Sequence, residues 1–252
     1  MATWHIGCSG FYYKHWKGGF YPIDLPQKKW FQYYNNHFKT LELNVTFYRF
    51  PQLKMVEGWY EKSTGDFTFS VKAPRLITHF KQFLECNQLL ADFYGVVREG
   101  LKGKAACILF QLPPRIAYKE ERLQRIISSL DYSFTNVLEF RHETWWNNEV
   151  YNQLAQHNIT FCGQSHPLLP ETAIQNNSVF YYRFHGVPNL YRSPYSEEKL
   201  RAFVAEIEAN KKVKEAFIYF NNDIEVSAIQ NALDMERFVA EIKKAPSKRK
   251  TL

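Results

Sequence analysis

Short apolar runs alternate with amphipathic segments along the whole chain, and this pattern predicts eight strands separated by helices. The predicted strands are 5–9, 40–45, 66–72, 105–111, the start of 136–146, 159–164, 178–184 and 216–221. Most of them are apolar on both faces, which is typical of a parallel sheet covered on both sides. Eight such units favour a closed (β/α)8 barrel, TIM-barrel-like and a single domain, over residues 1–242.

The segments between the strands read mostly as helices. The predicted helices are 27–38, one opened by Pro51, one ending near 99, 119–130, 148–157, 196–210 and 224–243. The crossover 167–177 is predicted as the eighth helix on the weakest pattern. An open doubly wound sheet is the alternative architecture, but no glycine-rich phosphate loop follows the first strand. A closed barrel is therefore favoured.

The net charge of +7 does not indicate a basic surface on the body of the chain, because most of it lies at the end of the sequence. The last ten residues, 243–252, carry five positive charges and no acidic side chain, which leaves the body of the chain at +2. Such a basic segment is typical of a disordered tail. The four cysteines form no CxxC pair, so neither a disulfide framework nor a zinc knuckle is predicted. Without an apolar run of membrane length or a leader, we expect a cytoplasmic protein with no membrane contact; the oligomeric state stays open.

Candidate chemistry lies at the carboxyl ends of the predicted strands, where the active site of a (β/α)8 barrel is built. The polar residues there are Ser9, Glu42, Asn44, Lys72, Gln111, Glu139, Arg141, His142, Gln164, His166, Arg183, His185, Asn221, Asn222 and Asp223. The most informative are charged residues within or directly on apolar runs, because burying an unpaired charge is costly. A purely structural ion-pair network is the alternative explanation.

Lys72, Arg141 and Arg183 come from the third, fifth and seventh strands, so we expect these cations to converge on a phosphate or carboxylate. The predicted catalytic residues are Glu139, Glu42, His185 and His142, as groups that move protons. The remaining predicted substrate contacts are Asn44, Gln111, His79, Trp145, Tyr191, Asn221 and Asn222. A metal site would gather Glu42, Glu139, His79 and His185, but no HxH or HxxxH spacing supports it. No metal or cofactor is therefore predicted.

Several motifs, spread in order over nearly the whole chain, together resemble one family. They include Gly7-Cys-Ser-Gly10, Glu42-Leu-Asn44, Val71-Lys-Ala-Pro74, Phe110-Gln-Leu-Pro-Pro114, Glu139-Phe-Arg-His142, Arg183-Phe-His-Gly186 and Tyr219-Phe-Asn-Asn222. The chain resembles the YecE-like family, also called domain of unknown function 72 (DUF72). The resemblance implies a TIM-barrel-like fold and no specific reaction. Around Gln164-Ser-His166 many relatives carry an aspartate that this chain lacks.

Three hypotheses for function follow from these observations. The first is an enzyme that acts on a small anionic, sugar-like substrate by acid/base chemistry, as an isomerase, lyase or hydrolase. The second is nucleic-acid binding or phosphodiester cleavage, with aromatic side chains stacking on bases and the basic tail adding charge. The third is a non-catalytic binding protein whose strand ends form a satisfied salt-bridge network.

Overall fold

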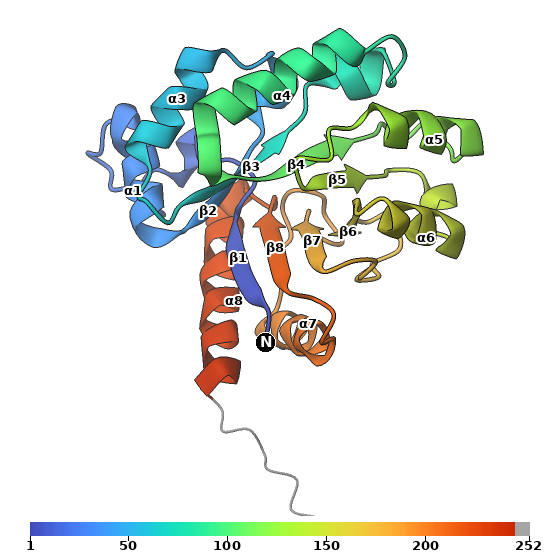
Figure 1. The fold of residues 1–252 in the computed structure, drawn as a ribbon. Helices are drawn as coiled ribbons and strands as arrows, with labels where there is room; N and C mark the ends of the chain where they lie inside the picture. The colour runs from blue at the N-terminus through green and yellow to red at the C-terminus, as the bar shows by residue number, and fades with distance from the viewer. Residues whose placement is uncertain (245–252) are drawn as a thin grey trace, which may run out of the picture.

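A computed structural model of the protein describes residues 1–244 and contains one eight-stranded parallel sheet curled into a barrel (Figure 1). The strands are β1 Thr3–Cys8, β2 Thr40–Leu43, β3 Thr68–Lys72, β4 Ala105–Gln111, β5 Asn136–Glu139, β6 Thr160–Ser165, β7 Val179–Phe184 and β8 Glu215–Phe220. Their order is β1-β8-β7-β6-β5-β4-β3-β2. The predicted TIM-barrel-like fold is confirmed.

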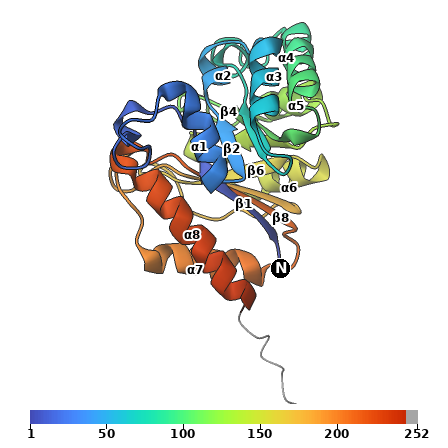
Figure 2. The same cartoon turned by 90° about the vertical axis from the view of Figure 1, so that its left-hand side faces the viewer.

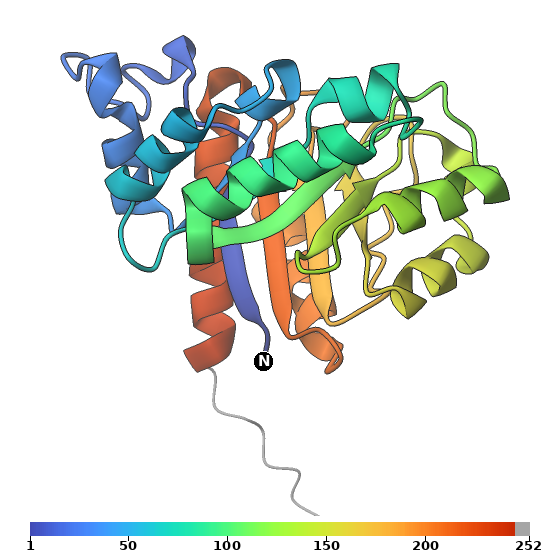
Figure 3. The same cartoon turned by 45° about the horizontal axis from the view of Figure 1, so that its top comes forward.

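Helices cover the outside of the barrel. They are α1 Trp30–His37, α2 Val45–Tyr48, α3 Leu53–Lys62, α4 Asn87–Leu101, α5 Glu120–Ser129, α6 Asn148–Gln156, α7 Glu197–Ala209 and α8 Ser227–Lys244, with short helical turns between several of them. Figure 3 shows α4 laid across the strands with α3 beside it, and Figure 2 shows α8 next to α7. The helices bury an outer core rich in aromatic side chains against the strands.

The prediction of a helix over 167–177 is wrong. The chain there is a turn followed by an extended segment. Asn176 accepts a hydrogen bond from the Phe161 N–H at 2.9 Å and donates one to the Ile159 carbonyl at 2.9 Å, which ties the segment to the start of β6. Prolines at 167 and 170 also disfavour a helix in this short crossover.

The barrel is nearly closed, because β1 and β2 meet along only part of their length. Near the carboxyl ends, the Gly10 N–H donates to the Glu42 carbonyl at 2.9 Å. Lower down, the Tyr34 hydroxyl accepts from the Cys8 N–H at 2.8 Å and donates to the Thr40 carbonyl at 3.0 Å. A tyrosine hydroxyl thus replaces direct strand pairing at this seam.

The middle of the barrel interior is a packed layer of side chains beneath the strand ends. Its members are Cys107, Leu109, Val137, Cys162, Tyr181, Phe217 and Tyr219, all buried. The Tyr219 hydroxyl satisfies its hydrogen bonds within this layer, with Thr40 at 2.6 Å and Ser70 at 2.9 Å. Any ligand at the strand ends therefore rests on a packed floor.

The end of the chain is only partly described. Helix α8 continues through Lys244, so two of the predicted tail residues are helical. The rest of the predicted disordered tail, 245–252, lies outside the described residues, and its disorder stays a prediction. Among the helices of the described part, none is both long enough and apolar enough to cross a bilayer.

Candidate functional site

An arginine held between two carboxylates forms the centre of the barrel mouth. Arg183, at the end of β7, donates from Nε to both carboxylate oxygens of Glu42 on β2, at 2.9 and 2.8 Å. Its Nη1 donates to Glu139 on β5 at 2.6 Å. Ser9 adds a hydrogen bond to Glu42 at 3.0 Å. All four side chains are buried, and alternation along each strand turns them to the inner face.

Glu139 stays ionised because the cations around it compensate its charge. Burial alone would raise the pKa of Glu139, but Arg141, Arg183 and Lys72 outweigh it and lower that pKa to about 2. Arg141 completes the pairing by donating from Nε to the second oxygen of Glu139. Buried ion pairs of this kind are stable only when nearly every polar atom finds a partner, as happens here.

His185 is a neutral member of the same network. Burial, followed by the positive charges of Arg141 and Arg183, holds the pKa of His185 well below its usual range. Arg141 Nη2 lies 2.9 Å from Nε2 of His185, and a guanidinium can only donate. The ring proton therefore lies on Nδ1, 3.0 Å from the Asn221 amide, which must present its oxygen there. Although Glu139 lies 3.8 Å from Nε2, no imidazolium ion pair forms.

Lys72 differs from every other charged group of the mouth. It ends β3, is only 8% exposed, and its Nζ lies 4.3 Å from the centre of the Phe47 ring. Within residues 1–244 its ammonium makes no hydrogen bond and no salt bridge. Burial and the nearby Arg183 lower the pKa of Lys72 to about 7, against a smaller opposing effect of Glu139 and Glu42.

A pocket of about 320 Å³ opens above Lys72. Its lining residues are Tyr13, Asn44, Phe47, Tyr48, Lys72, Arg183, Tyr191, Asn221 and Asp223. The Asn44 side-chain oxygen is buried and lacks a hydrogen-bond partner in the described part of the chain. The volume suits a small molecule, and Lys72 and Asn44 offer it two uncommitted polar groups.

The surroundings of the pocket carry a positive potential. His79, at the end of the turn after β3, and His166, after β6, are both half-buried, and the pKa of each is lowered to about 4. Burial is the largest cause. For His79 the next is the charge of Lys72, and for His166 it is Arg141. Both imidazoles are neutral at pH 7, and a bound anion would raise their pKa values.

Four of the predicted site residues lie elsewhere. His142 contacts Thr144 and caps the turn Glu143–Trp145. Trp145 stacks on Phe140 in the outer core, with ring centres 4.0 Å apart. Asn222 bonds to Ser193 and Asn231 and ties the loop after β7 to α8. Gln111 donates to the neighbouring Leu112 carbonyl at 3.2 Å.

The predicted site residues do not include three aromatic residues of the pocket, Tyr13, Phe47 and Tyr48. Phe47 follows the polar end of β2 by less than one helical turn, so its position in α2 was the available signal. Tyr13 lies in the aromatic loop after β1, where nothing distinguishes it from its neighbours; its hydroxyl donates to the Ser9 carbonyl at 2.6 Å.

The four residues considered for a metal site take other roles. No group of three or more His, Cys, Asp or Glu side chains within 1–244 is arranged to hold a metal ion. Glu42 and Glu139 pair with Arg183, His185 pairs with Arg141, and the Nδ1 of His79 lies 2.8 Å from the hydroxyl of its neighbour Thr78.

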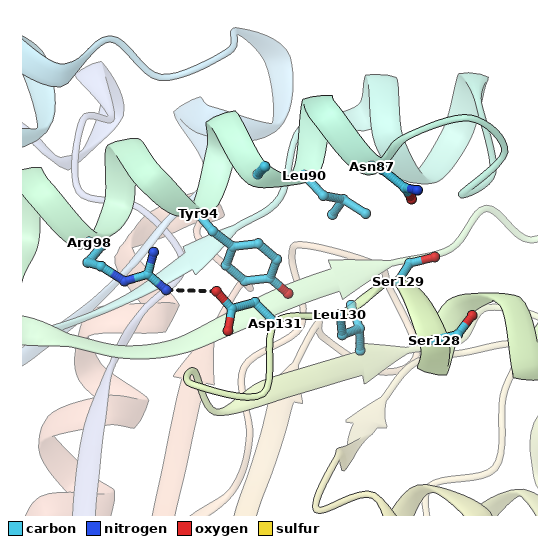
Figure 4. A pocket seen from close by; sticks show the side chains of 9 residues that line it. Asn87, Leu90, Tyr94, Arg98, Ser128, Ser129, Leu130 and Asp131 are labelled. Carbon is cyan, nitrogen blue, oxygen red and sulfur yellow. Dashed lines mark hydrogen bonds and ion pairs between the residues drawn. The ribbon is translucent and has the colours of Figure 1, made fainter.

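A second pocket, of about 360 Å³, lies on the outside between α4 and the segment joining α5 to β5 (Figure 4). Its most prominent feature is an ion pair between Arg98 and Asp131 at 2.7 Å. Arg98 also stacks over the Phe134 ring at 4.9 Å, so both charges have structural partners. We place the candidate site at the barrel mouth, because Lys72 and Asn44 carry uncommitted polar groups there.

Comparison with known families agrees with the architecture. The model of the family described as "Protein of unknown function DUF72" matches residues 5–251. The chain belongs to the DUF72 family. Its relatives include UPF0759 protein YunF of Bacillus subtilis, 26% identical over 85% of this chain and 88% of YunF. UPF0759 protein YecE of Escherichia coli is 30% identical over 48% of each chain.

Solved structures extend this result. A DUF72 family protein from Thermotoga maritima superposes with a TM-score of 0.86 at 27% identity, covering 94% of this chain and 99% of that protein. D-Psicose 3-epimerase from Clostridium cellulolyticum superposes over 95% of this chain and 97% of its own, with a TM-score of 0.52 and 13% identity. The second likeness shows the barrel fold alone. DUF72 membership therefore gives this chain its fold and leaves its reaction to be argued from the site.

Proposed function

We propose that the barrel mouth binds a small anionic substrate and converts it by acid/base chemistry in which Lys72 moves the proton. The observation that carries this proposal is the unpaired ammonium of Lys72 at the floor of a pocket of about 320 Å³. Within residues 1–244 the Lys72 ammonium contacts the face of Phe47 but has no hydrogen-bond acceptor, and burying a cation without an acceptor is costly. A bound anion would supply the missing partner.

The other ionisable groups of the mouth are committed to one another. Glu42 and Glu139 are held by arginines, and the lone pair of His185 Nε2 accepts from Arg141. These side chains therefore position and stabilise. Lys72, with a pKa of about 7, is present in both protonation states near neutrality, which is the condition for an efficient general acid or base.

The charge balance of the mouth favours an anion over a cation. The two carboxylates are matched by Arg141 and Arg183, so a protonated Lys72 is in excess. Arg75 and Arg115 add positive potential, since both contribute to the lowered pKa of His79. Asp223 lines the pocket as well; burial raises the pKa of its carboxyl, and its Oδ2 lies 3.7 Å from Nε2 of His15.

Titration calorimetry with inorganic phosphate and with lactate tests this proposal. We expect wild-type protein to bind at least one of these anions, and Lys72→Met to bind it at least tenfold more weakly. The matched control is Lys102→Met, because Lys102 also lies over an aromatic ring, 5.0 Å from the centre of Tyr60, but precedes β4 at the opposite end of the strands. This control should bind within twofold of wild type.

The proposal is wrong if neither anion binds, or if Lys72→Met binds as tightly as wild type. The pH profile gives a second readout. Because the ammonium is the form that pairs with an anion, affinity should decrease as the pH rises above the pKa of Lys72, about 7. The Lys102 variant should keep that profile.

A further inference from the structure

We propose that Lys72 forms an imine with a carbonyl group of the substrate, so that the substrate class is a small anionic aldehyde or ketone such as a 2-oxo acid. This inference rests on the proposed function, since it places the reacting carbonyl in the same pocket. It adds a covalent role for the amine that general acid/base chemistry does not require.

A nucleophilic amine needs a lone pair that points into free space, and Lys72 fits that condition. Lys104 provides the contrast within this chain. Its Nζ also lies over an aromatic ring, 4.6 Å from the centre of Tyr60, yet it donates to Tyr60 O, Ser63 O and Ser63 Oγ at 3.0, 3.0 and 2.7 Å. Lys104 is thus used as a structural donor, whereas Lys72 keeps its nitrogen free above Phe47.

The protonation state of Lys72 also favours it as the nucleophile. With a pKa of about 7, near half of the Lys72 side chains are neutral amines at pH 7. An ordinary lysine with a pKa near 10.4 is neutral in only about one molecule in 10³ at that pH. Burial is the main cause of the difference, and lysines activated in this way are the ones that form imines in enzymes.

The reaction balances without an oxidant, a reductant or a further reactant. The neutral Nζ attacks the carbonyl carbon, a C–N bond forms, and one Nζ proton passes to the carbonyl oxygen to give a carbinolamine. The carbinolamine hydroxyl takes up a proton from solvent, the C–O bond breaks, water leaves, and the nitrogen lone pair forms the C=N bond of a protonated imine. Loss of the remaining Nζ proton to solvent gives the imine, so one amine and one carbonyl give one imine and one water. Glu139 and Glu42 raise the pKa of Lys72 through their charges, and the same charges stabilise a protonated imine.

Two further lining residues suit these steps. The Asn44 side-chain oxygen is uncommitted within residues 1–244 and can accept a hydrogen bond from the carbinolamine hydroxyl. Asp223 lines the same pocket, and its carboxyl, whose pKa is raised by burial, can relay protons between the carbinolamine and solvent. Both residues follow strand ends, Asn44 after β2 and Asp223 after β8, and so lie on the same rim as Lys72.

Reductive trapping tests the imine directly. Wild-type protein is incubated with glyoxylate and sodium cyanoborohydride at pH 7, and each lysine is then assayed for carboxymethylation by peptide mass mapping. We expect Lys72 to be modified at least tenfold faster than Lys104 or Lys102. Inorganic phosphate should slow the modification of Lys72 alone. Neutral acetaldehyde should modify Lys72 more slowly than glyoxylate does.

Mapping in the wild-type protein avoids any dependence on a variant that folds poorly. The variant Lys72→Arg, whose folding is checked by circular dichroism, keeps the positive charge and lacks the nucleophilic amine. We expect no rapidly carboxymethylated lysine in this variant. Equal modification of all three lysines would overturn the imine proposal. If phosphate still binds in a Lys72-dependent way in that case, the anion site stands without the imine. If Lys72 is trapped selectively but neither phosphate nor lactate binds, the imine stands and the anionic substrate class falls.

Discussion

The two inward-facing cations Arg183 and Lys72 lie in the same mouth and have opposite environments. Arg183 is 1% exposed and spends its guanidinium on Glu42 and Glu139 at 2.6–2.9 Å. Lys72 is 8% exposed, and in the part of the chain that the structure describes its ammonium contacts the face of Phe47 and no hydrogen-bond acceptor. Arg183 connects β7 to β2 and β5 across the barrel, whereas the ammonium of Lys72 forms no hydrogen bond or salt bridge within residues 1–244.

This difference separates structural from functional charge. A paired network stabilises the arrangement of the strand ends and specifies which strands face each other. An unpaired buried cation lowers stability, and proteins tolerate such groups mainly where a ligand or a reaction uses them. We therefore interpret the ion-pair network as the structural support of the site, and Lys72 as the functional group that this network positions.

The largest expected effect is the loss of stability when the ion-pair network around Arg183 is broken. Replacing Arg183 by Met leaves Glu42 and Glu139 buried without their main partner, and breaking such a network typically costs about 3–5 kcal/mol. Urea denaturation at pH 7 would measure this loss. Arg192→Met is the matched control, because Arg192 pairs with Glu225 at 2.9 Å on the surface, where a salt bridge contributes about 0–1 kcal/mol. Equal losses in the two variants would refute the distinction.

For Lys72→Met we expect the opposite effect, an increase in the free energy of unfolding. The pKa of Lys72 is about 7 in the folded protein and 10.5 ordinarily. Below pH 7 the folded protein therefore bears the full cost of burying the Lys72 ammonium, and the free energy of unfolding rises as the pH increases from about 7 to 10.5. The variant lacks this penalty, and after allowing for relaxation of the site we expect a gain of about 1–3 kcal/mol at pH 6. Thermal and urea unfolding between pH 6 and 10 would show the gain shrinking with rising pH. A loss of stability at pH 6 would make Lys72 a structural residue.

The same comparison shows what the sequence could reveal. Period-two alternation was enough to place Glu139 and Arg141 on one face of their strand, and eight strand ends were enough to predict the barrel. Whether a buried charge has a partner depends on side chains from distant strands, so the contrast between Lys72 and Arg183 was invisible in the pattern. The prediction of Trp145 as a substrate contact fails for a related reason. A residue just after a strand end can fold back onto the outer core, as Trp145 does against Phe140.

The smallest expected effect concerns an unpaired charge without a pocket role. Glu236 lies midway along α8, is partly buried, and has no hydrogen bond or salt bridge within residues 1–244. Burial raises its pKa to about 7 from 4.5, so its contribution to stability is fully present below 4.5 and is lost as the pH rises through 7.

We expect Glu236→Gln to remove this loss and to be more stable than wild type by about 1–2 kcal/mol at pH 8, after discounting for solvent screening. At pH 4 the two proteins should be equally stable in urea denaturation. Glu241→Gln, on the same helix but exposed and paired with Arg201 at 2.6 Å, should show no gain at pH 8. A Glu236 variant that gains stability without changing anion binding would show that being unpaired does not by itself make a site. The pocket above Lys72 would then be the feature that distinguishes the two residues, whereas a destabilised variant at pH 8 would mean that Glu236 has a partner after all.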